Sequence, residues 1–219
     1  MRTTRRPGPP ASGRTSLRSA TRVVQAFVLV AALAALVPAT AAAGPVDTPG
    51  FTKAFSCSAC HGSAGAARAD AVPILAGMPA WYLKKAIDDY ASGRRPSPEM
   101  EPFSKMVTTL GVDDVAAYFA TQKREASPIK LDRAAIASGR TAATQCAGCH
   151  GQDGRGDQAK GTPPLAGQPA GYLLNQMKLF KADKRSPGDA NLTALKALMK
   201  GVDDPTLANL AAYYASLGR

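Results

Sequence analysis

Two copies of a cysteine–histidine motif are the residues of this 219-residue chain best suited to chemistry. They are CSACHG, with Cys57, Cys60 and His61, and CAGCHG, with Cys146, Cys149 and His150. A histidine directly after a C-x-x-C pair is typical of c-type haem attachment. The two thiols bond the two vinyl groups of one haem, and the adjacent imidazole coordinates the iron from one face. The sequence therefore predicts two covalently attached haems.

Other uses of the four cysteines are alternatives to haem attachment. Cysteines of an exported protein often form disulfides, and C-x-x-C pairs also occur in redox dithiols and zinc sites. Zinc ribbons usually separate their pairs by about 15 to 20 residues. Here 85 residues lie between Cys60 and Cys146. The spacing and the adjacent histidines favour haem over zinc and over disulfides.

The histidine count limits what the two irons can do. His61 and His150 are the only histidines, and the motifs use both. A haem with two histidine ligands is therefore excluded within one chain, and so is a histidine acting as a distal acid or base. The sixth ligand is a methionine, another residue or nothing. Methionine with histidine is the pairing of electron carriers and raises the reduction potential.

Met100 and Met199 are the methionines predicted to be sixth ligands. Met100 lies in RRPSPEMEPF, a proline-rich segment suited to bring a thioether over the haem, and Met106 is its competitor. Met199 is the only methionine in the comparable region after the second motif. Its segment NLTALKALMKG looks helical, so a packing role for Met199 is the alternative. Met78 and Met177 are expected to pack.

An internal repeat positions the two motifs, which are 89 residues apart. A glycine precedes each motif by seven residues, PILAGMPAWYL and PPLAGQPAGYL follow, and GVDDVAAYF and GVDDPTLANLAAYY come last. The polar segment 123–130 (KREASPIK) is the expected linker. We therefore predict one domain over 44–122 and another over 131–219. A domain of this size rarely builds a sufficient core alone, and a large apolar cofactor would complete it.

Hydrophobic periodicity predicts an all-α fold. Helices are expected over 81–91, 113–121, 132–145, 172–182 and 207–217. Asp203 or Asp204 is suited to cap the last of these helices. No segment alternates polar and apolar residues as a half-buried strand does. The sequence thus favours two small helical domains with long, glycine- and proline-rich loops.

Residues 1–43 are expected to be a signal peptide. They contain six arginines and no acidic residue, then the uncharged run Val23–Val37, then small residues up to Ala43. This order is typical of secretory signals, and the run of 15 residues is shorter than the ~20 residues of a membrane span. Cleavage is expected before Gly44, with export to the periplasm by the general secretory route. An uncleaved membrane anchor is the alternative.

The net charge of the remaining chain is mild. After residue 43 there are 21 basic and 16 acidic residues, a net charge of +5. No basic stripe interleaved with aromatic residues is present, which argues against a nucleic-acid partner. A mild positive charge can still steer docking onto an acidic redox partner.

Charged pairs recur in the sequence. The acidic pairs at 88–89, 113–114 and 203–204 are expected on helix faces and caps. The basic pairs at 94–95 and 184–185 lie at matching places of the repeat. These basic side chains either pair with haem propionates or remain solvated.

With these motifs the chain resembles the di-haem class I cytochromes c of the cytochrome c4 family. The resemblance covers nearly all residues after 43 and rests on CSACHG/CAGCHG, PILAGM/PPLAGQ, SGRR/ADKR and AAYF/AAYY. It implies two tandem cytochrome c domains related by a pseudo-twofold axis, with the haem propionates near the interface. The family's ligand methionine often stands in a Met-x-Pro context, which Met100-Glu101-Pro102 matches.

The resemblance also implies a helix contact in each domain. The glycine upstream of the motif packs against an aromatic residue of the last helix. Gly50 would meet Tyr118 or Phe119, and Gly139 would meet Tyr213 or Tyr214.

Two features depart from the family pattern. The helix after Gly111 is three residues shorter than the helix after Gly201. In the second repeat, Leu195 or Leu192 stands where the pattern expects the ligand methionine, and Met199 lies one turn beyond Leu195.

The resemblance implies an electron carrier rather than an enzyme. Its redox partners would be a terminal oxidase, a cytochrome bc1-type complex or a dehydrogenase. A second hypothesis is the haem subunit of a flavin-containing or other dehydrogenase. A third hypothesis, an enzyme or gas-binding protein, requires that the second haem lack a firm sixth ligand.

Overall fold

The computed structural model describes Gly8, residues 48–125 and residues 127–218. Apart from Gly8, the predicted signal peptide at 1–43 lies outside these described residues, as does its cleavage site. The described residues form helices and loops, with one isolated β-bridge between Asp157 and Thr162 and no strand among them. The prediction of an all-α fold is confirmed.

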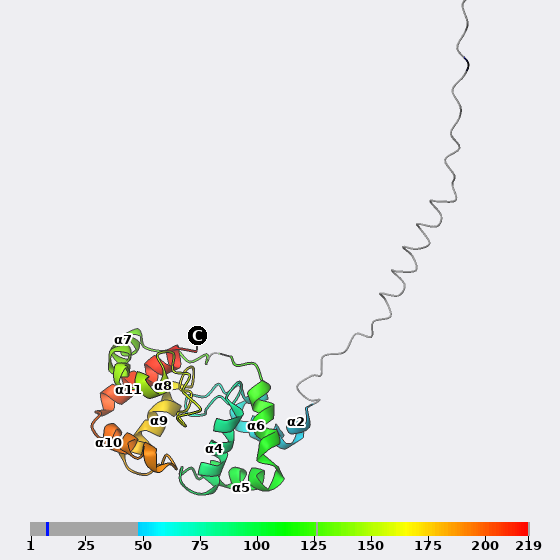
Figure 1. Ribbon diagram of the computed structural model, residues 1–219, viewed down its shortest axis with the longest axis horizontal. Coiled ribbons are helices and arrows are strands. Elements are labelled where there is room, and N and C mark those ends of the chain that lie inside the picture. Colours follow the sequence, from blue (N-terminus) through cyan, green and yellow to red (C-terminus); the bar gives the residue numbers. More distant parts are fainter. Residues whose placement is uncertain (1–7, 9–47, 126, 219) are drawn as a thin grey trace, which may run out of the picture. The chain divides into compact units, whose positions relative to one another are not determined.

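The helices fall into two groups along the chain (Figure 1). Residues 48–122, the first half, contain α2 (Pro49–Ala54), η2 (Phe55–Cys57), α3 (Ser58–His61), η3 (Ser63–Gly65), α4 (Ala80–Ala91), α5 (Met100–Leu110) and α6 (Val112–Thr121). Residues 131–218, the second half, contain α7 (Arg133–Ala142), η4 (Ala143–Gln145), α8 (Ala147–His150), α9 (Ala170–Lys181), η5 (Ala190–Leu192), α10 (Ala194–Lys200) and α11 (Asp204–Ser216). Every helix expected from the sequence is present, with small differences at the ends.

Local sequence explains where these helices begin. Helices α4 and α9 each start directly after a proline, Pro79 and Pro169, whose fixed φ suits a helix start. Asp132 caps α7 by accepting from the Ala134 amide at 3.0 Å. Asp203 caps α11 by accepting from the Thr206 amide at 2.7 Å. The cap predicted at 203 or 204 is therefore Asp203.

In each half, the helix before the motif crosses the last helix at a glycine. A Cβ added to Gly50 of α2 would lie 2.7 Å from the Tyr118 Cβ of α6. A Cβ added to Gly139 of α7 would lie 2.8 Å from the Tyr213 Cβ of α11. Both distances are too short for real carbon atoms, so only glycine permits these crossings. The expected contacts are confirmed, with Tyr118 and Tyr213 as the aromatic partners.

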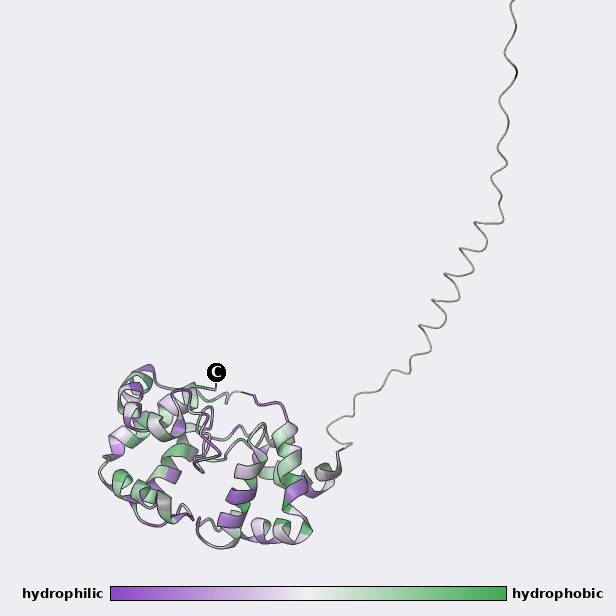
Figure 2. Cartoon of the chain, in the orientation of Figure 1, coloured by the Kyte–Doolittle hydropathy of each residue, from purple (hydrophilic) through white to green (hydrophobic). Residues whose placement is uncertain are grey.

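Each half has its own cluster of buried apolar residues. In the second half, α11 contributes Leu207, Leu210, Ala211 and Tyr214 at the i, i+3, i+4 and i+7 spacing of one helix face. In the first half, α6 contributes Val115 and Phe119. Figure 2 shows hydrophilic and hydrophobic bands along α4. Leu83 and Tyr90 of this helix are buried.

Polar contacts join the two halves. Gln168 accepts from the Ile74 amide at 2.9 Å and donates to the Ile74 carbonyl at 2.8 Å. Asp70 accepts from the Gly171 amide at 2.9 Å, and its carbonyl accepts from the Tyr172 amide at 2.8 Å. The first half therefore satisfies backbone donors at the start of α9, which the first turn of a helix otherwise leaves unpaired.

The helices of the described residues are too short or too polar to span a bilayer. This finding leaves open the membrane-anchor alternative, which concerns residues outside that part of the chain.

We predict that Gly139→Ala destabilises the protein by about 3 kcal/mol, because the new methyl group would lie 2.0 Å from the Asn209 carbonyl oxygen. Denaturant unfolding of the haem-loaded protein measures the loss. Gly201→Ala is the control, since its Cβ would meet nothing closer than 3.5 Å. Equal stability of the two variants would contradict the close crossing of α7 and α11.

Candidate haem-binding sites

Each cysteine–histidine motif lies on a single turn of helix. Helix α3 carries Cys60 and His61 directly after Cys57, and α8 carries Cys149 and His150 directly after Cys146. None of the four cysteines, which all lie in the described part of the chain, forms a disulfide. In each motif the first cysteine is half-buried and the second is exposed. One helical turn therefore presents two thiols and an imidazole within reach of a single macrocycle.

A backbone carbonyl fixes the orientation of each histidine ring. His61 Nδ1 lies 2.9 Å from the Pro73 carbonyl oxygen, and His150 Nδ1 lies 3.0 Å from the Pro163 carbonyl oxygen. Since a carbonyl only accepts hydrogen bonds, Nδ1 carries the proton in both rings. The lone pair of Nε2 is then available to a metal, as an iron ligand requires.

Burial favours the neutral forms of the motif histidines and of the first cysteine of each motif. It lowers the pKa of His61 and of His150, which disfavours the imidazolium that cannot bind iron. It also raises the pKa of the Cys57 and Cys146 thiols. The two motifs therefore share a buried environment as well as their cysteine and histidine residues.

A large apolar cavity adjoins the second motif. Its volume is about 460 Å³, within the range of cofactor sites. Cys146, Cys149 and His150 line one part of it, and α9, α10 and α11 contribute mostly apolar side chains. The cavity suits a flat apolar macrocycle that is held by the thiols.

Met199 lies in the same cavity as His150. It is 7% exposed, is part of α10 and also belongs to the buried cluster of the second half. Its position is therefore compatible with iron ligation and with packing, the two roles that the sequence left open. Met177 and Met78 line the cavity as well. Met78 belongs to the buried cluster of the first half and Met177 packs against that of the second, so both pack as expected.

Helix α5 carries both candidate methionines of the first half. Met100 is its first residue and is half-buried, and the Met100 amide donates to Ser97 Oγ at 3.2 Å. Met106 lies in the middle of the helix and is 38% exposed, on a stripe with Phe103 and Leu110. Met100 therefore belongs to the helix itself, and the expectation that the proline-rich segment forms a loop up to Met100 and a helix only after it is wrong at this residue.

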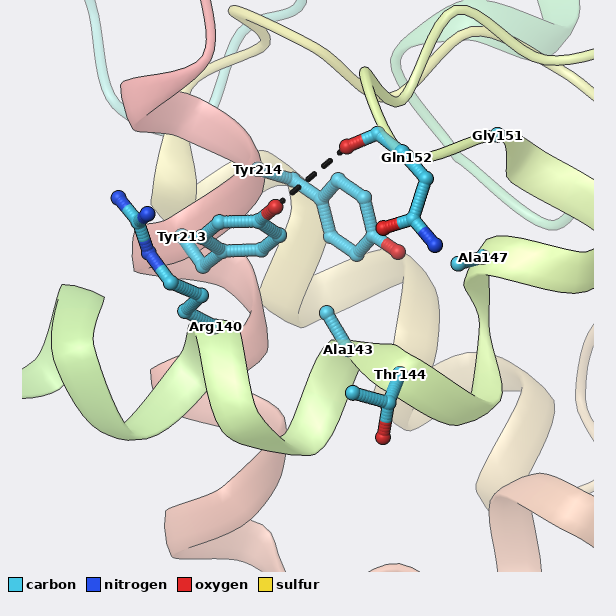
Figure 3. Close-up of a pocket in the computed structure, with 8 residues that line it drawn as sticks. All are labelled: Arg140, Ala143, Thr144, Ala147, Gly151, Gln152, Tyr213 and Tyr214. Carbon is cyan, nitrogen blue, oxygen red and sulfur yellow. Dashed lines mark hydrogen bonds between the residues drawn. The ribbon is translucent and has the colours of Figure 1, made fainter.

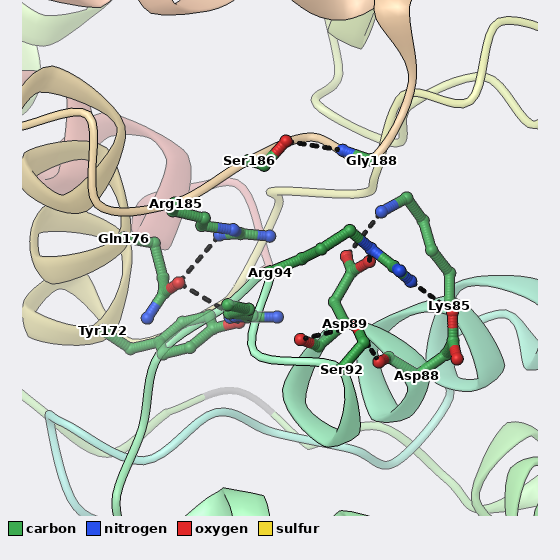
Figure 4. A network of polar contacts seen from close by, with 11 residues as sticks. Lys85, Asp88, Asp89, Ser92, Arg94, Tyr172, Gln176, Arg185, Ser186 and Gly188 are labelled. Carbon is green, nitrogen blue, oxygen red and sulfur yellow. Dashed lines mark hydrogen bonds and ion pairs between the residues drawn. The ribbon is translucent and has the colours of Figure 1, made fainter.

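Two buried arginines, Arg95 and Arg185, meet at Gln176 where the halves contact each other. Figure 4 shows Arg185 beside Gln176. Arg95 is 1% exposed and donates to the Tyr172 hydroxyl, and its Nε donates to Gln176 Oε1 at 2.9 Å. Arg185 is 8% exposed and donates to the same Gln176 oxygen at 2.8 Å. Within the described residues, Arg185 Nε is buried without an acceptor. Solvation, one of the two alternatives for these basic residues, is therefore wrong for Arg95 and Arg185.

This arginine cluster holds positive charge that its neighbours do not neutralise. The two guanidinium groups donate to neutral oxygens of tyrosine and glutamine. Burial lowers the pKa of Arg185, and Arg95 lowers it further. Burial raises the pKa of Tyr82, but Arg95 and Arg185 outweigh burial and bring it to about 8. Because a buried charge needs a counter-charge, the cluster fits the propionates of a haem.

A smaller cavity of about 140 Å³ lies beside the second motif, between α7, α8 and α11 (Figure 3). The Tyr213 hydroxyl donates to the Gln152 carbonyl at 3.5 Å, and the Arg140 guanidinium lies 5.9 Å from the centre of the Tyr213 ring. The centre of the Tyr214 ring lies 6.5 Å from the centre of the His150 ring. The last helix therefore holds the motif from this side.

Comparisons with known proteins agree with this geometry. The family model for cytochrome c matches residues 136–218. Cytochrome c4 from Pseudomonas aeruginosa is 31% identical over 175 residues, which cover 77% of this chain and 87% of that protein. The chain belongs to the cytochrome c4 family. It is thus a di-haem electron-transfer cytochrome with two covalently attached c-type haems.

Solved structures and a further relative extend the comparison. Cytochrome c4 from Pseudomonas stutzeri superposes with a TM-score of 0.64 at 27% identity, covering 76% of this chain and 95% of that one. The fold is therefore that of two tandem class I cytochrome c domains. A thiosulfate dehydrogenase from Marichromatium purpuratum gives a TM-score of 0.67 at 29% identity, and this chain covers 39% of it. A thiosulfate dehydrogenase electron acceptor from Stutzerimonas stutzeri is 32% identical over 76% of this chain and 81% of that protein.

Sequence reasoning missed part of these sites. The Pro73 and Pro163 carbonyls were not singled out, although a proline 12 or 13 residues after each histidine was a visible signal. Gln176 was also missed, because its counterpart in the first repeat is Ala86 and no pattern marks it.

We predict that Arg185→Met lowers the reduction potential of the second haem by about 40 mV, equivalent to ~1 kcal/mol of lost attraction for the added electron. Spectroelectrochemistry of both haems measures the shift. Lys184→Met is the control, because it removes a neighbouring cation that is exposed. A shift of the same size in the control would contradict the special role of the buried charge.

Proposed function

We propose that this protein is a periplasmic electron carrier that takes electrons from a dehydrogenase and passes them towards a terminal oxidase. The observation that carries the proposal is the placement of Met199 in the cavity of His150, in a chain with no third histidine. An iron held by histidine and methionine changes oxidation state without opening a site for substrate. The protein then acts as a carrier and not as an enzyme.

The proposed iron ligands are His61 and Met100 in the first half and His150 and Met199 in the second. Cys57, Cys60, Cys146 and Cys149 are the proposed attachment residues. Met100 is supported by its place on the half-buried side of α5, which it shares with the buried Ser104 and Val107. When bound, the haem supplies the electron-transfer chemistry. The chain holds it in a dry pocket and supplies the arginine cluster as a counter-charge.

We also propose the boundaries of the parts of the chain. Residues 1–43 would be removed on export, 44–122 and 131–219 would form the two domains, and 123–130 would link them. The two separate apolar clusters support this division.

A second candidate is the haem subunit of a dehydrogenase. It is favoured by the likeness to the thiosulfate dehydrogenase of Marichromatium purpuratum, of which this chain covers 39%, and by relatives named as electron acceptors of thiosulfate dehydrogenase. This candidate differs from the carrier in one measurable respect, since a subunit stays bound to its enzyme.

The donor assay separates these functions. Protein isolated from the periplasmic fraction, which should begin at Gly44, is mixed with thiosulfate dehydrogenase and thiosulfate, and haem reduction is followed by stopped flow. A carrier is reduced with second-order kinetics and elutes alone from a sizing column. Co-elution with a dehydrogenase supports the subunit candidate, and turnover of a substrate by the isolated cytochrome contradicts the carrier.

Methionine substitutions test the sixth ligands. We predict that Met100→Ala lowers the potential of the first haem, and Met199→Ala that of the second, by on the order of 0.1 V, because each iron loses a ligand that favours its reduced state. Both haems stay covalently attached, since the thioether bonds are untouched. Met106→Ala is the matched control on α5. A lowered potential in Met106→Ala together with an unchanged potential in Met100→Ala would overturn the Met100 assignment.

A further inference from the structure

One of the acidic residues expected on helix faces is buried between the two halves. Asp89 of α4 is 2% exposed. Its carboxylate pairs with Lys85 and accepts from Arg94 Nε at 3.0 Å (Figure 4). Arg94 also pairs with Asp88. The three charges at 85, 89 and 94 therefore fix the Arg94 side chain in one position.

Arg94 lies against a loop of the second half. The Ser186 amide donates to the Arg94 carbonyl at 2.9 Å. A Cβ added to Gly188 would lie 3.2 Å from Arg94 Nε and 3.4 Å from Asp89 Oδ1. The loop thus rests directly on the Asp89–Arg94 pair, and we name this meeting of Asp89, Arg94, Ser186 and Gly188 the Arg94 contact.

The loop that Arg94 touches forms part of the second haem cavity. Pro187, between the two contacting residues, is buried and lines the cavity, and so does Leu192 further along. Helix α10 follows directly and brings Met199 to the cavity. The position of the loop at 186–188 therefore affects the cavity wall that contains Met199, the proposed ligand.

The Arg94 contact has no counterpart on the other side of the interface. The repeat places Asn175, Leu179 and Lys184 where the first half has Lys85, Asp89 and Arg94. Without a carboxylate at 179, the second half cannot form the same charged group against the first. The effect of the contact should therefore fall on one haem only.

We propose that the Asp89–Arg94 pair of the first half is a positioning element for the second haem site. It holds the Ser186–Gly188 loop against the cavity and so keeps the wall that carries Met199 closed to water. A closed wall favours the reduced iron, because water entering a haem pocket lowers the reduction potential. The inference rests on the proposed haem site at His150.

The test uses the haem-loaded full-length mature protein with Arg94→Ala. Deuterium uptake of residues 186–192 is expected to rise about tenfold, because a buried carboxylate loses a charged hydrogen-bond donor. Uptake of the equivalent residues 96–102 should stay as in the wild type. The potential of the second haem should fall while that of the first is unchanged.

Two variants distinguish the effect of holding the loop in position from the effect of the positive charge of Arg94. Lys184→Ala, at the equivalent place in the second repeat, should change neither uptake nor potential. Arg94→Lys keeps the charge but loses the planar fork that reaches both aspartates, so it should restore the potential only in part. The proposal is overturned if uptake of 186–192 in Arg94→Ala equals the wild type, or if Arg94→Lys restores the potential fully while uptake stays high.

The deuterium-uptake result does not depend on whether Met199 is an iron ligand. If Met199→Ala leaves the second haem potential unchanged, the ligand proposal fails. Uptake of residues 186–192 still decides whether Arg94 holds the loop.

Discussion

The fixed imidazole of each motif is the interaction on which the rest of the molecule depends. A proline carbonyl accepts a hydrogen bond from the Nδ1–H of His61 and of His150, which leaves Nε2 as the only metal-binding atom of each ring. Because the chain has no other histidine, a protein ligand on the far face of each iron has to be a different kind of side chain. Helices α5 and α10, which carry the proposed ligands Met100 and Met199, lie between the motif and the last helix in the order of each half.

The interface between the halves departs from the symmetry of the repeat. Gln168 bridges both backbone atoms of Ile74, but Met78 stands at the matching position and cannot make the reverse pair. Arg124 compensates, since it donates to the Met78 sulfur at 3.0 Å and to the Ala166 carbonyl at 2.7 Å. Unequal contacts on the two sides give the haems different surroundings, and a difference in potential gives an electron a preferred site.

Much of this structure could be predicted from the sequence. The helices follow from hydrophobic periodicity, and the repeat follows from the matching motifs. The glycine crossings at Gly50 and Gly139 follow from the resemblance to the cytochrome c4 family, and the structure explains them by the lack of space for a Cβ. Which side chains lie at the interface could not be predicted. Arg94 and Arg95 are adjacent, yet only Arg95 is fully buried. Hydrophobic periodicity also could not predict that Met100 is the first residue of α5, because a proline-rich segment permits both a loop and a helix start.

Carbon monoxide binding to the reduced protein tests the central claim most directly, namely that a side chain closes both irons. The fraction of haem that binds the gas is measured by absorbance, with the amount of iron as reference. Neither haem is expected to bind the gas, because His61 and the proposed ligand Met100 would coordinate one iron, and His150 and the proposed ligand Met199 the other. Binding at half of the haems would show that one iron is open and would contradict the assignment of a plain electron carrier.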